Sequence, residues 1–154
     1  MLTRQKKLLR DVITVVVFTA IAVVAMINFK DWVDRSEAIR AMEQLSREVF
    51  KYRKDHGILP PESYVAAIKR KDLEAGVHLA NLLYRALWID FEATPGEILA
   101  YTEKKYRSSF LSDGYVVLRL DGRVQWMGKQ QFKELLAQQQ SESEIEMLQQ
   151  ERQE

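Results

Sequence analysis

The chain has 154 residues, with 23 lysines and arginines against 22 aspartates and glutamates, and it contains no cysteine. This balance of charge predicts no basic face for nucleic acid. The lack of cysteine excludes disulfide bonds, thiolate chemistry and cysteine-bound zinc. The residues beyond Phe29 are enough for one small domain with its own core and too few for two.

An uncharged apolar run extends from Val12 to Phe29. As an α-helix, its 18 residues span about 27 Å, close to the ~30 Å thickness of membrane hydrocarbon. Trp32 follows, where the aromatic belt of a membrane protein is expected. The run therefore predicts a transmembrane helix over residues 12–29, anchored by Val12, Val16, Phe18, Ile21, Val24 and Phe29.

Basic residues precede the apolar run. Residues 1–11 contain four lysines or arginines and a single acid, Asp11. After the run the charges balance, in Lys30, Asp31, Asp34 and Arg35. The positive-inside bias therefore predicts that residues 1–11 lie in the cytoplasm and the rest of the chain on the far side of the membrane.

Two other interpretations of the run are open. It is either a cleaved signal peptide, with Ala20-Ile-Ala22 as the cleavage site, or the buried helix of a soluble protein. Cleavage there would leave the signal peptide with a short apolar core, whereas the apolar run continues well past that point, to Phe29. An uncleaved anchor is therefore the favoured interpretation.

The next segment, residues 31–56, contains no glycine or proline, and its apolar residues recur at spacings of three and four. This spacing is typical of a helix with one apolar face. We expect the membrane helix to continue as one amphipathic helix until Gly57, with Pro60-Pro61 preventing its resumption. The apolar stripe packs either on the chain's own later domain, which we favour, or on a partner helix in a coiled coil. The stripe consists of Ala38, Met42, Leu45, Val49 and Tyr52.

The apolar spacing over residues 62–91 predicts a second helix. Strands are then expected at residues 97–102, 115–120 and 123–127, the last two joined by Asp121-Gly122. That dipeptide predicts a two-residue hairpin turn in which both residues take positive φ. Alternation of Val124 and Trp126 with polar residues predicts one buried and one solvent-exposed face for the last strand.

A final helix is expected from near Lys129, burying Phe132, Leu135 and Leu136. Residues 138–154 are mostly polar with a net negative charge, so we expect a polar tail that is disordered or a frayed helix. The predicted fold class is α+β. It comprises an N-terminal transmembrane helix continuing into a long amphipathic helix, a helical insertion, a small antiparallel sheet with an Asp-Gly hairpin, and the polar tail.

The sequence contains no glycine-rich phosphate loop, no Gly-x-Ser-x-Gly elbow and no His-Glu-x-x-His pair. Its two histidines, His56 and His78, are expected to be structural; His56 suits the negative end of a helix dipole. We therefore expect no catalytic, cofactor-binding or metal-ligating residues, no cofactor and no small-molecule substrate. An enzyme with an unfamiliar site is the third alternative, and a deep pocket holding titratable groups would indicate it.

Three features occur together in this chain. The first is the membrane helix that runs on into an amphipathic helix, and the second is the helix exit Tyr52-Arg-Lys-Asp-His-Gly-Ile-Leu-Pro60. The third is the C-terminal order of Ile98-Leu-Ala-Tyr101, a strand starting at Asp113, and a hairpin motif formed by Asp121, Gly122, Val124 and Trp126 before a short helix. In these features the chain resembles the type IV pilin and type II secretion pseudopilin superfamily. Its end is similar to the prepilin-type processing-associated C-terminal domain.

The N-terminus departs from that superfamily. Pilins are cut after a glycine just before the apolar run and carry a glutamate at the fifth mature position. Here the first glycine is Gly57 and the first glutamate is Glu37. The histidine that usually precedes the Asp-Gly pair of the processing-associated group is replaced by Leu111. We therefore expect neither peptidase processing nor ordinary filament assembly.

The resemblance implies a non-catalytic, single-pass protein of the bacterial inner membrane, with a pilin-like periplasmic domain over residues 30–137. Its implied role is structural, in assembling a pseudopilus or secretion-type apparatus. The expected partners are membrane lipid and other proteins, or a second copy of the chain, which meet the N-terminal helix at Thr19, Ala22 and Ala25. The alternative is a membrane-tethered coiled-coil scaffold in which residues 31–56 pair with a partner helix.

Overall fold

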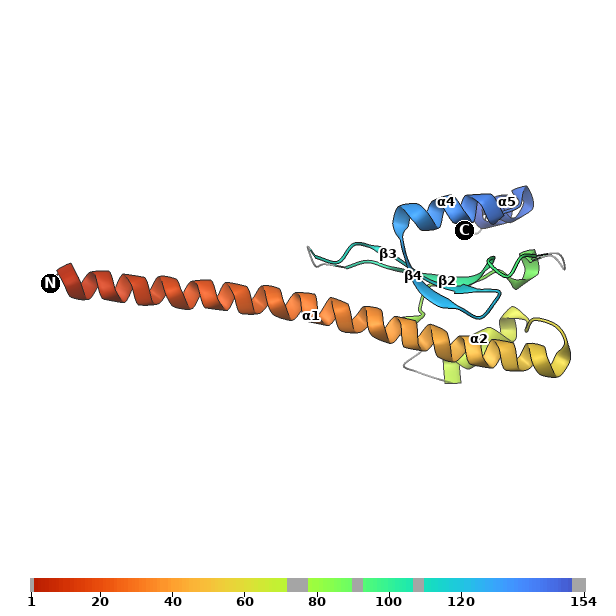
Figure 1. Cartoon of the computed structure of the whole chain (residues 1–154), viewed down its shortest axis with the longest axis horizontal. Helices are drawn as coiled ribbons and strands as arrows, with labels where there is room; N and C mark the ends of the chain where they lie inside the picture. Colours follow the sequence, from red (N-terminus) through yellow and green to blue (C-terminus); the bar gives the residue numbers. More distant parts are fainter. Residues whose placement is uncertain (1, 72–77, 90–92, 107–109, 151–154) are drawn as a thin grey trace.

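The computed structural model describes residues 2–71, 78–89, 93–106 and 110–150. The chain is α+β, as predicted, with one long N-terminal helix, three further α-helices and a small antiparallel sheet (Figure 1). The elements are α1 (Leu2–His56), α2 (Glu62–Lys71), β1 (Leu82–Tyr84), the 3-10 helix η1 (Ala86–Trp88), β2 (Ile98–Lys104), β3 (Gly114–Arg119), β4 (Val124–Gly128), α4 (Lys129–Gln139) and α5 (Glu142–Gln150).

Helix α1 is one continuous helix of 55 residues. It confirms that the apolar run and the amphipathic segment form a single element, because no glycine or proline interrupts them. Gly57 has a φ of 75° and its N–H donates to the carbonyl oxygen of Arg53 at 2.8 Å, the left-handed cap that ends many helices. Figure 1 shows the first half of α1 projecting away from the molecule and its second half lying along the sheet.

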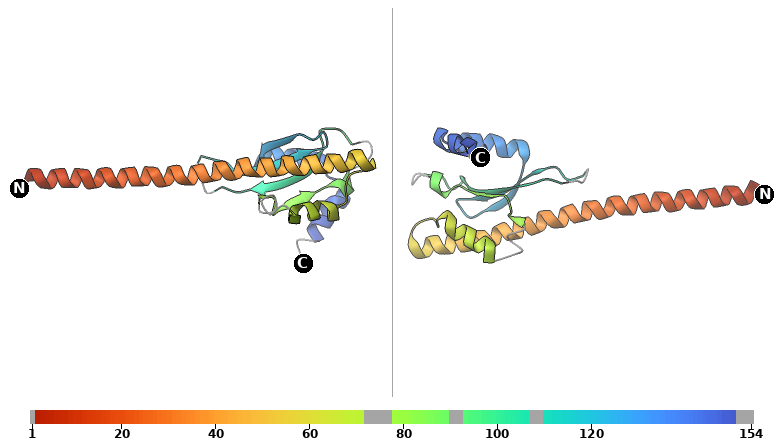
Figure 2. Two further views of the ribbon diagram at one scale, coloured as in Figure 1. Left: turned by 90° about the horizontal axis from the view of Figure 1, so that it is seen from below. Right: turned by 180° about the vertical axis from the view of Figure 1, so that it is seen from behind.

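The sheet is the middle of three layers. Its strand order is β1-β2-β3-β4, with every neighbouring pair antiparallel. Helices α1 and α2 cover one face, and α4 and α5 cover the other (Figures 1 and 2). Successive strand residues point to opposite faces, so Val116 and Leu118 join the core beneath α1 whereas Val117 joins the core beneath α4.

The prediction of one buried and one solvent-exposed face for the last strand holds only in part, because Arg123 is exposed but Gln125 is half-buried. Val124 and Trp126 pack toward α1, but Met127 is buried on the opposite face together with Phe132 of α4. Helix α4 follows β4 directly and folds back over the sheet. The sign of this cover within β4 is Met127, an apolar residue on the same face as Arg123 and Gln125.

The prediction of one helix over residues 62–91 is also wrong in its second half. Helix α2 ends at Lys71, and residues 82–84 form the edge strand β1, followed by the 3-10 helix η1. An apolar spacing of three to five suits a short buried strand as well as a helix. Residues 82–84 form a strand because they pair with the edge of β2. The break expected near Gly76 lies outside the described residues.

The Asp121-Gly122 pair lies in the hairpin between β3 and β4, but the predicted turn type is wrong. Gly122 has a φ of 86°, whereas no described non-glycine residue has a positive φ. The N–H of Arg119 donates to the carbonyl of Arg123 at 2.9 Å, and the N–H of Gly122 donates to the carbonyl of Arg119 at 3.0 Å. This is a three-residue loop closed by one left-handed glycine. The Asp121 carboxylate accepts the N–H of Arg123 at 2.9 Å, so it serves the turn.

The segment predicted as a polar tail contains the end of α4 and the whole of α5. It is a docked helix over its described residues, which corrects the expectation of a disordered or frayed tail. The side chains of Arg85 and Glu144 are 3% and 1% exposed and form an ion pair, with Nε–Oε1 at 2.6 Å and Nη2–Oε2 at 2.8 Å. Arg85 also donates to the carbonyl oxygens of Ile98 and Gln139. This buried pair fixes α5 to the connection between β1 and η1.

Candidate membrane-anchoring site

The side chains of the apolar segment of α1, residues 12–29, are exposed except that of Asn28, which is half-buried. Within its most apolar stretch none of the 18 residues is buried, and the helix is long and apolar enough to cross a membrane. The interpretation as the buried helix of a soluble domain is therefore wrong for this fold. A contiguous apolar surface of this size marks a lipid or protein contact. The expected anchor residues are all exposed: Val12, Val16, Phe18, Ile21, Val24 and Phe29.

Polar side chains within this segment bond to their own helix. The hydroxyl groups of Thr14 and Thr19 donate to the carbonyls of Arg10 and Val15, each at 2.8 Å. The amide of Asn28 donates to the carbonyl of Val24 at 2.7 Å. Bonds of this kind satisfy polar groups where no water is present, so the segment's polar residues are compatible with a hydrocarbon environment.

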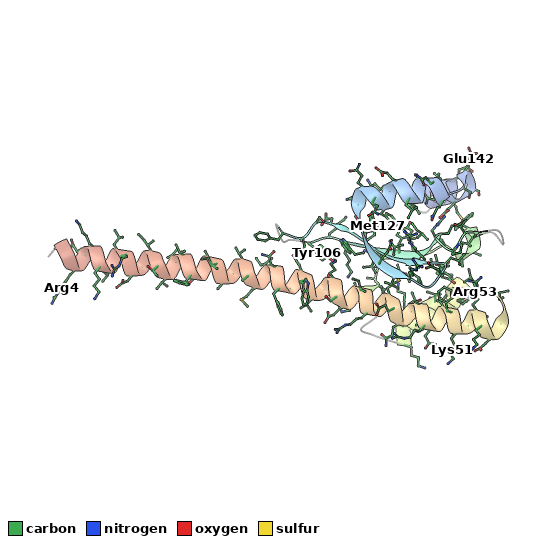
Figure 3. The ribbon with its side chains drawn as sticks, viewed as in Figure 1. Arg4, Lys51, Arg53, Tyr106, Met127 and Glu142 are labelled. Atoms are coloured by element: carbon green, nitrogen blue, oxygen red, sulfur yellow. The ribbon has the colours of Figure 1, made fainter. Side chains whose placement is uncertain are left out.

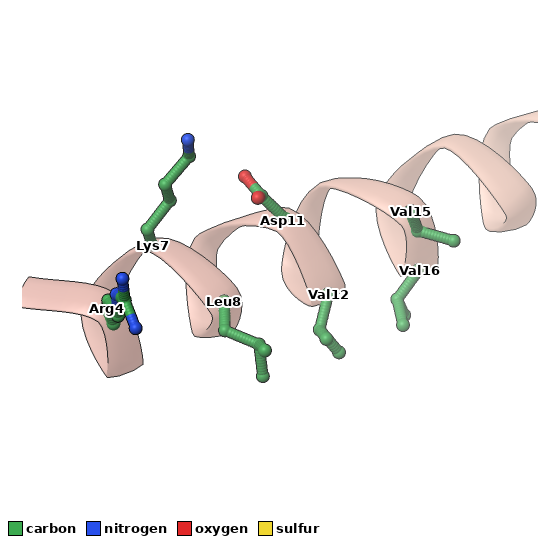
Figure 4. Close-up of a pocket in the computed structure, with 7 residues that line it drawn as sticks. All are labelled: Arg4, Lys7, Leu8, Asp11, Val12, Val15 and Val16. Carbon is green, nitrogen blue, oxygen red and sulfur yellow. The ribbon is translucent and has the colours of Figure 1, made fainter.

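The N-terminal end of the segment carries the basic residues. Figure 4 shows Arg4 and Lys7 one to two turns before the first valines, with Asp11 between them and Val12 along the helix. A shallow hollow on this side is lined by residues of α1 alone, from Arg4 to Val16. Because a single helix forms both its walls, the hollow is a feature of the helix surface and not an enclosed ligand cavity.

Aromatic side chains join the apolar segment to the folded domain. The exposed rings of Phe29 and Trp32 lie 6.3 Å apart where the apolar segment ends. The guanidinium group of Arg35 stacks over the Trp126 ring at 4.2 Å, and the Tyr106 ring lies 5.6 Å from that same ring. Burial raises the pKa of the Tyr106 hydroxyl, which therefore stays protonated. The sheet is thus fastened to α1 within two turns of the apolar segment.

Polar and charged side chains reinforce this junction. Asp34 lies 3.2 Å from Nδ1 of His78 and 3.7 Å from Nζ of Lys104, and Glu37 lies 3.1 Å from Nε2 of His78. His78 therefore connects α1 to the segment before β1. His56 caps α1, with Nδ1 3.1 Å from the carbonyl oxygen of Tyr52. No three His, Cys, Asp or Glu side chains are grouped to hold a metal ion in the part of the chain that the structure describes.

The helix stripe faces the chain's own sheet. Four of its residues are buried there and Tyr52 is half-buried; the buried ones are Ala38, Met42, Leu45 and Val49. The hydroxyl of Ser46 donates to the carbonyl of Gly122 at 3.2 Å, so the β3–β4 hairpin is also bonded to α1. The surface expected to pair with a coiled-coil partner is therefore occupied within one chain.

A groove of about 540 Å³ lies at the end of the domain farthest from the apolar segment, between the end of α1 and η1. Its polar lining residues are Tyr52, Arg53, Glu62 and Tyr84. The Tyr84 hydroxyl donates to the carbonyl of Pro60 at 3.0 Å, and burial raises its pKa. The other described lining residues are apolar or glycine, and among them the groove has no serine, cysteine or histidine.

Sequence reasoning missed the Arg85–Glu144 pair. The one available signal was that Arg85 is a lone charge in the apolar stretch from Leu82 to Trp88.

Comparisons of the chain with protein-family models, with curated proteins and with solved structures find no match. The functional argument therefore rests on the fold and on the exposed apolar segment, and the pilin resemblance stays a prediction.

Proposed function

We propose that this chain is a single-pass protein of a bacterial inner membrane, anchored by residues 12–29 and carrying its folded domain on the periplasmic side. The domain has a structural role in assembling a pseudopilus or secretion-type apparatus and is not an enzyme. One observation carries the proposal: α1 is a single helix. Its apolar segment is exposed, and one face of its second half is buried against the chain's own sheet. Such a helix sets the position of the domain relative to the membrane.

The charges around the segment support the proposed orientation. Four basic residues and one acid precede it, whereas the charges that follow are balanced, and two of them, Asp34 and Arg35, contact the sheet. Basic residues near the end of a spanning helix favour the cytoplasmic side. The N-terminus is therefore cytoplasmic in this proposal.

The arrangement of the domain supports the pilin-like part of the proposal. The second half of α1 packs against an antiparallel sheet, and the Asp-Gly hairpin lies against that helix through Gly122 and Trp126. This is the architecture that the resemblance implies. The groove near Tyr84 is lined mainly by apolar residues, which favours binding over catalysis.

Alkaline carbonate extraction of cell envelopes tests the anchor. We expect the full chain to stay in the membrane pellet and its domain to be cleaved by protease added to the periplasmic side. Mass spectrometry of the N-terminus distinguishes the cleaved signal, because a start near Ala22 would make the protein a secreted one. Release by carbonate, or protection of the domain from external protease, would contradict the proposal.

Self-association through the apolar segment is a separate prediction. Replacing both Ala22 and Ala25 by leucine is expected to weaken the signal in a membrane two-hybrid assay severalfold, because larger side chains keep two helices apart. Ala20→Leu makes the same kind of change at one position on the opposite side of the helix and is the control. An unchanged signal for the double variant would show that the chain does not pair through this face.

A further inference from the structure

The β2–β3 hairpin points along α1 toward the apolar segment. Gly122, just before β4, lies against Phe50, whereas Trp126 lies against Arg35, so β4 runs antiparallel to α1. β2 runs in the same direction as β4, because both are antiparallel to β3. Figures 1 and 2 show this end of the sheet extending beside α1 toward its N-terminus. Figure 3 places Tyr106 at this end of the sheet.

The connection from β2 to β3 is long enough to reach the level of the apolar segment. Lys104 ends β2 and pairs with Asp34, which is five residues beyond Phe29, or about 7.5 Å along the helix. Phe110 is four residues from Gly114, the β3 partner of Lys104, which allows a reach of up to about 13 Å. The hairpin therefore has the length to bring Phe110 level with the end of the apolar segment.

The exposed side chains of this end of the domain have the chemistry of a membrane–water boundary. Phe110 is 79% exposed, and Phe29 and Trp32 on α1 are also largely exposed. Lys105 contributes an exposed ammonium group, which lies 3.5 Å from the Glu103 carboxylate. Aromatic rings with basic groups nearby are typical of this boundary, whereas exposed apolar rings are unfavourable in water.

We infer that Phe110, between β2 and β3, makes a second membrane contact by entering the boundary between headgroups and acyl chains of the leaflet that α1 leaves. This inference rests on the proposed function, because only an anchored chain brings Phe110 to a lipid surface. Lipid is the occupant because the exposed apolar surface of α1 leads directly to the hairpin. Two contacts fix the tilt and rotation of the domain on the membrane, which a single helix leaves free.

The absence of cysteine allows the test to use single labels on the full chain. Phe110→Cys, Phe29→Cys and Leu87→Cys are each labelled with an environment-sensitive fluorophore and reconstituted into vesicles of phosphatidylethanolamine and phosphatidylglycerol. Leu87 is the matched control, because it is 81% exposed and borders the groove at the other end of the domain. We expect blue-shifted emission and comparable quenching by acyl-brominated lipid for the labels at Phe110 and Phe29, and neither effect for Leu87.

The outcomes separate this inference from the proposed function. Quenching at Phe29 with Phe110 behaving like Leu87 would overturn the hairpin contact and leave the anchor standing. No quenching at Phe29 would overturn the anchor itself. A Phe110 label shielded from aqueous iodide but insensitive to brominated lipid would indicate a protein partner and would also overturn the inference. If Phe110→Cys fails to fold, a label at Lys105 gives the same decision, with quenching expected between that of Phe29 and Leu87.

Discussion

Replacing Glu144 by glutamine is expected to lower the free energy of unfolding of the domain by about 3–5 kcal/mol. The carboxylate makes two charge-assisted hydrogen bonds to the buried guanidinium group of Arg85. Glutamine keeps the size of the side chain but removes its charge, so the cation of Arg85 is left buried without a counterion. The carbonyl oxygens that Arg85 also contacts supply no compensating charge. Urea unfolding of the full chain in detergent micelles, followed by tryptophan fluorescence, measures the change.

Two further variants isolate the cause of this loss. Glu146→Gln makes the same change two residues further along α5 at an exposed position, so we expect a change within about 0.5 kcal/mol. Replacing Arg85 by methionine together with Glu144 by leucine is expected to recover much of the stability, since an apolar pair removes both buried charges. Equal stabilities for Glu144→Gln and Glu146→Gln would show that this ion pair does not hold α5.

Replacing Met42 by alanine is expected to lower the free energy of unfolding by about 2–5 kcal/mol. The Met42 side chain is fully buried between α1 and the sheet, so its truncation removes apolar contacts and leaves a cavity. Met26 is the matched control on the same helix, because it is 72% exposed in the apolar segment. Met26→Ala should leave unfolding of the domain unchanged in the same urea titration.

The dependence of the Met42→Ala result on concentration decides between a self-packed domain and a coiled-coil scaffold. Where Met42 packs on its own sheet, the unfolding midpoint is independent of protein concentration for both the parent chain and the variant. Where it packs on a partner helix, the midpoint rises with concentration. A rising midpoint in the parent chain, lost in Met42→Ala, would favour the scaffold.

Local pattern predicted the longest element well. The apolar run and the three-and-four spacing after it indicated one helix ending at Gly57, and α1 is such a helix. Helix formation depends on periodicity and on the absence of breakers, both of which a sequence displays directly. The position of the hairpin near Asp121-Gly122 was also predicted, although its loop has one more residue than expected.

Features that depend on distant partners were not predicted. Strand β1 forms because β2 offers it an edge, and the second face of the sheet is covered because α4 folds back over it. The polar composition of residues 138–154 predicted a tail, yet Glu144 is buried because Arg85, 59 residues earlier, supplies its counterion. The composition of a segment describes its residues on average. The burial of one charged residue depends instead on whether a single residue elsewhere in the chain pairs with it.

The sequence by itself determined that this protein has a long N-terminal helix whose first half is apolar and whose second half carries an apolar stripe, because both properties follow from residues close together in the chain. Only the tertiary structure decided that the stripe is used by the chain's own sheet, that α5 is docked by a buried ion pair, and that the β2–β3 hairpin points toward the apolar segment. Each of these depends on contacts between residues far apart in sequence, and local periodicity contains no information about such contacts.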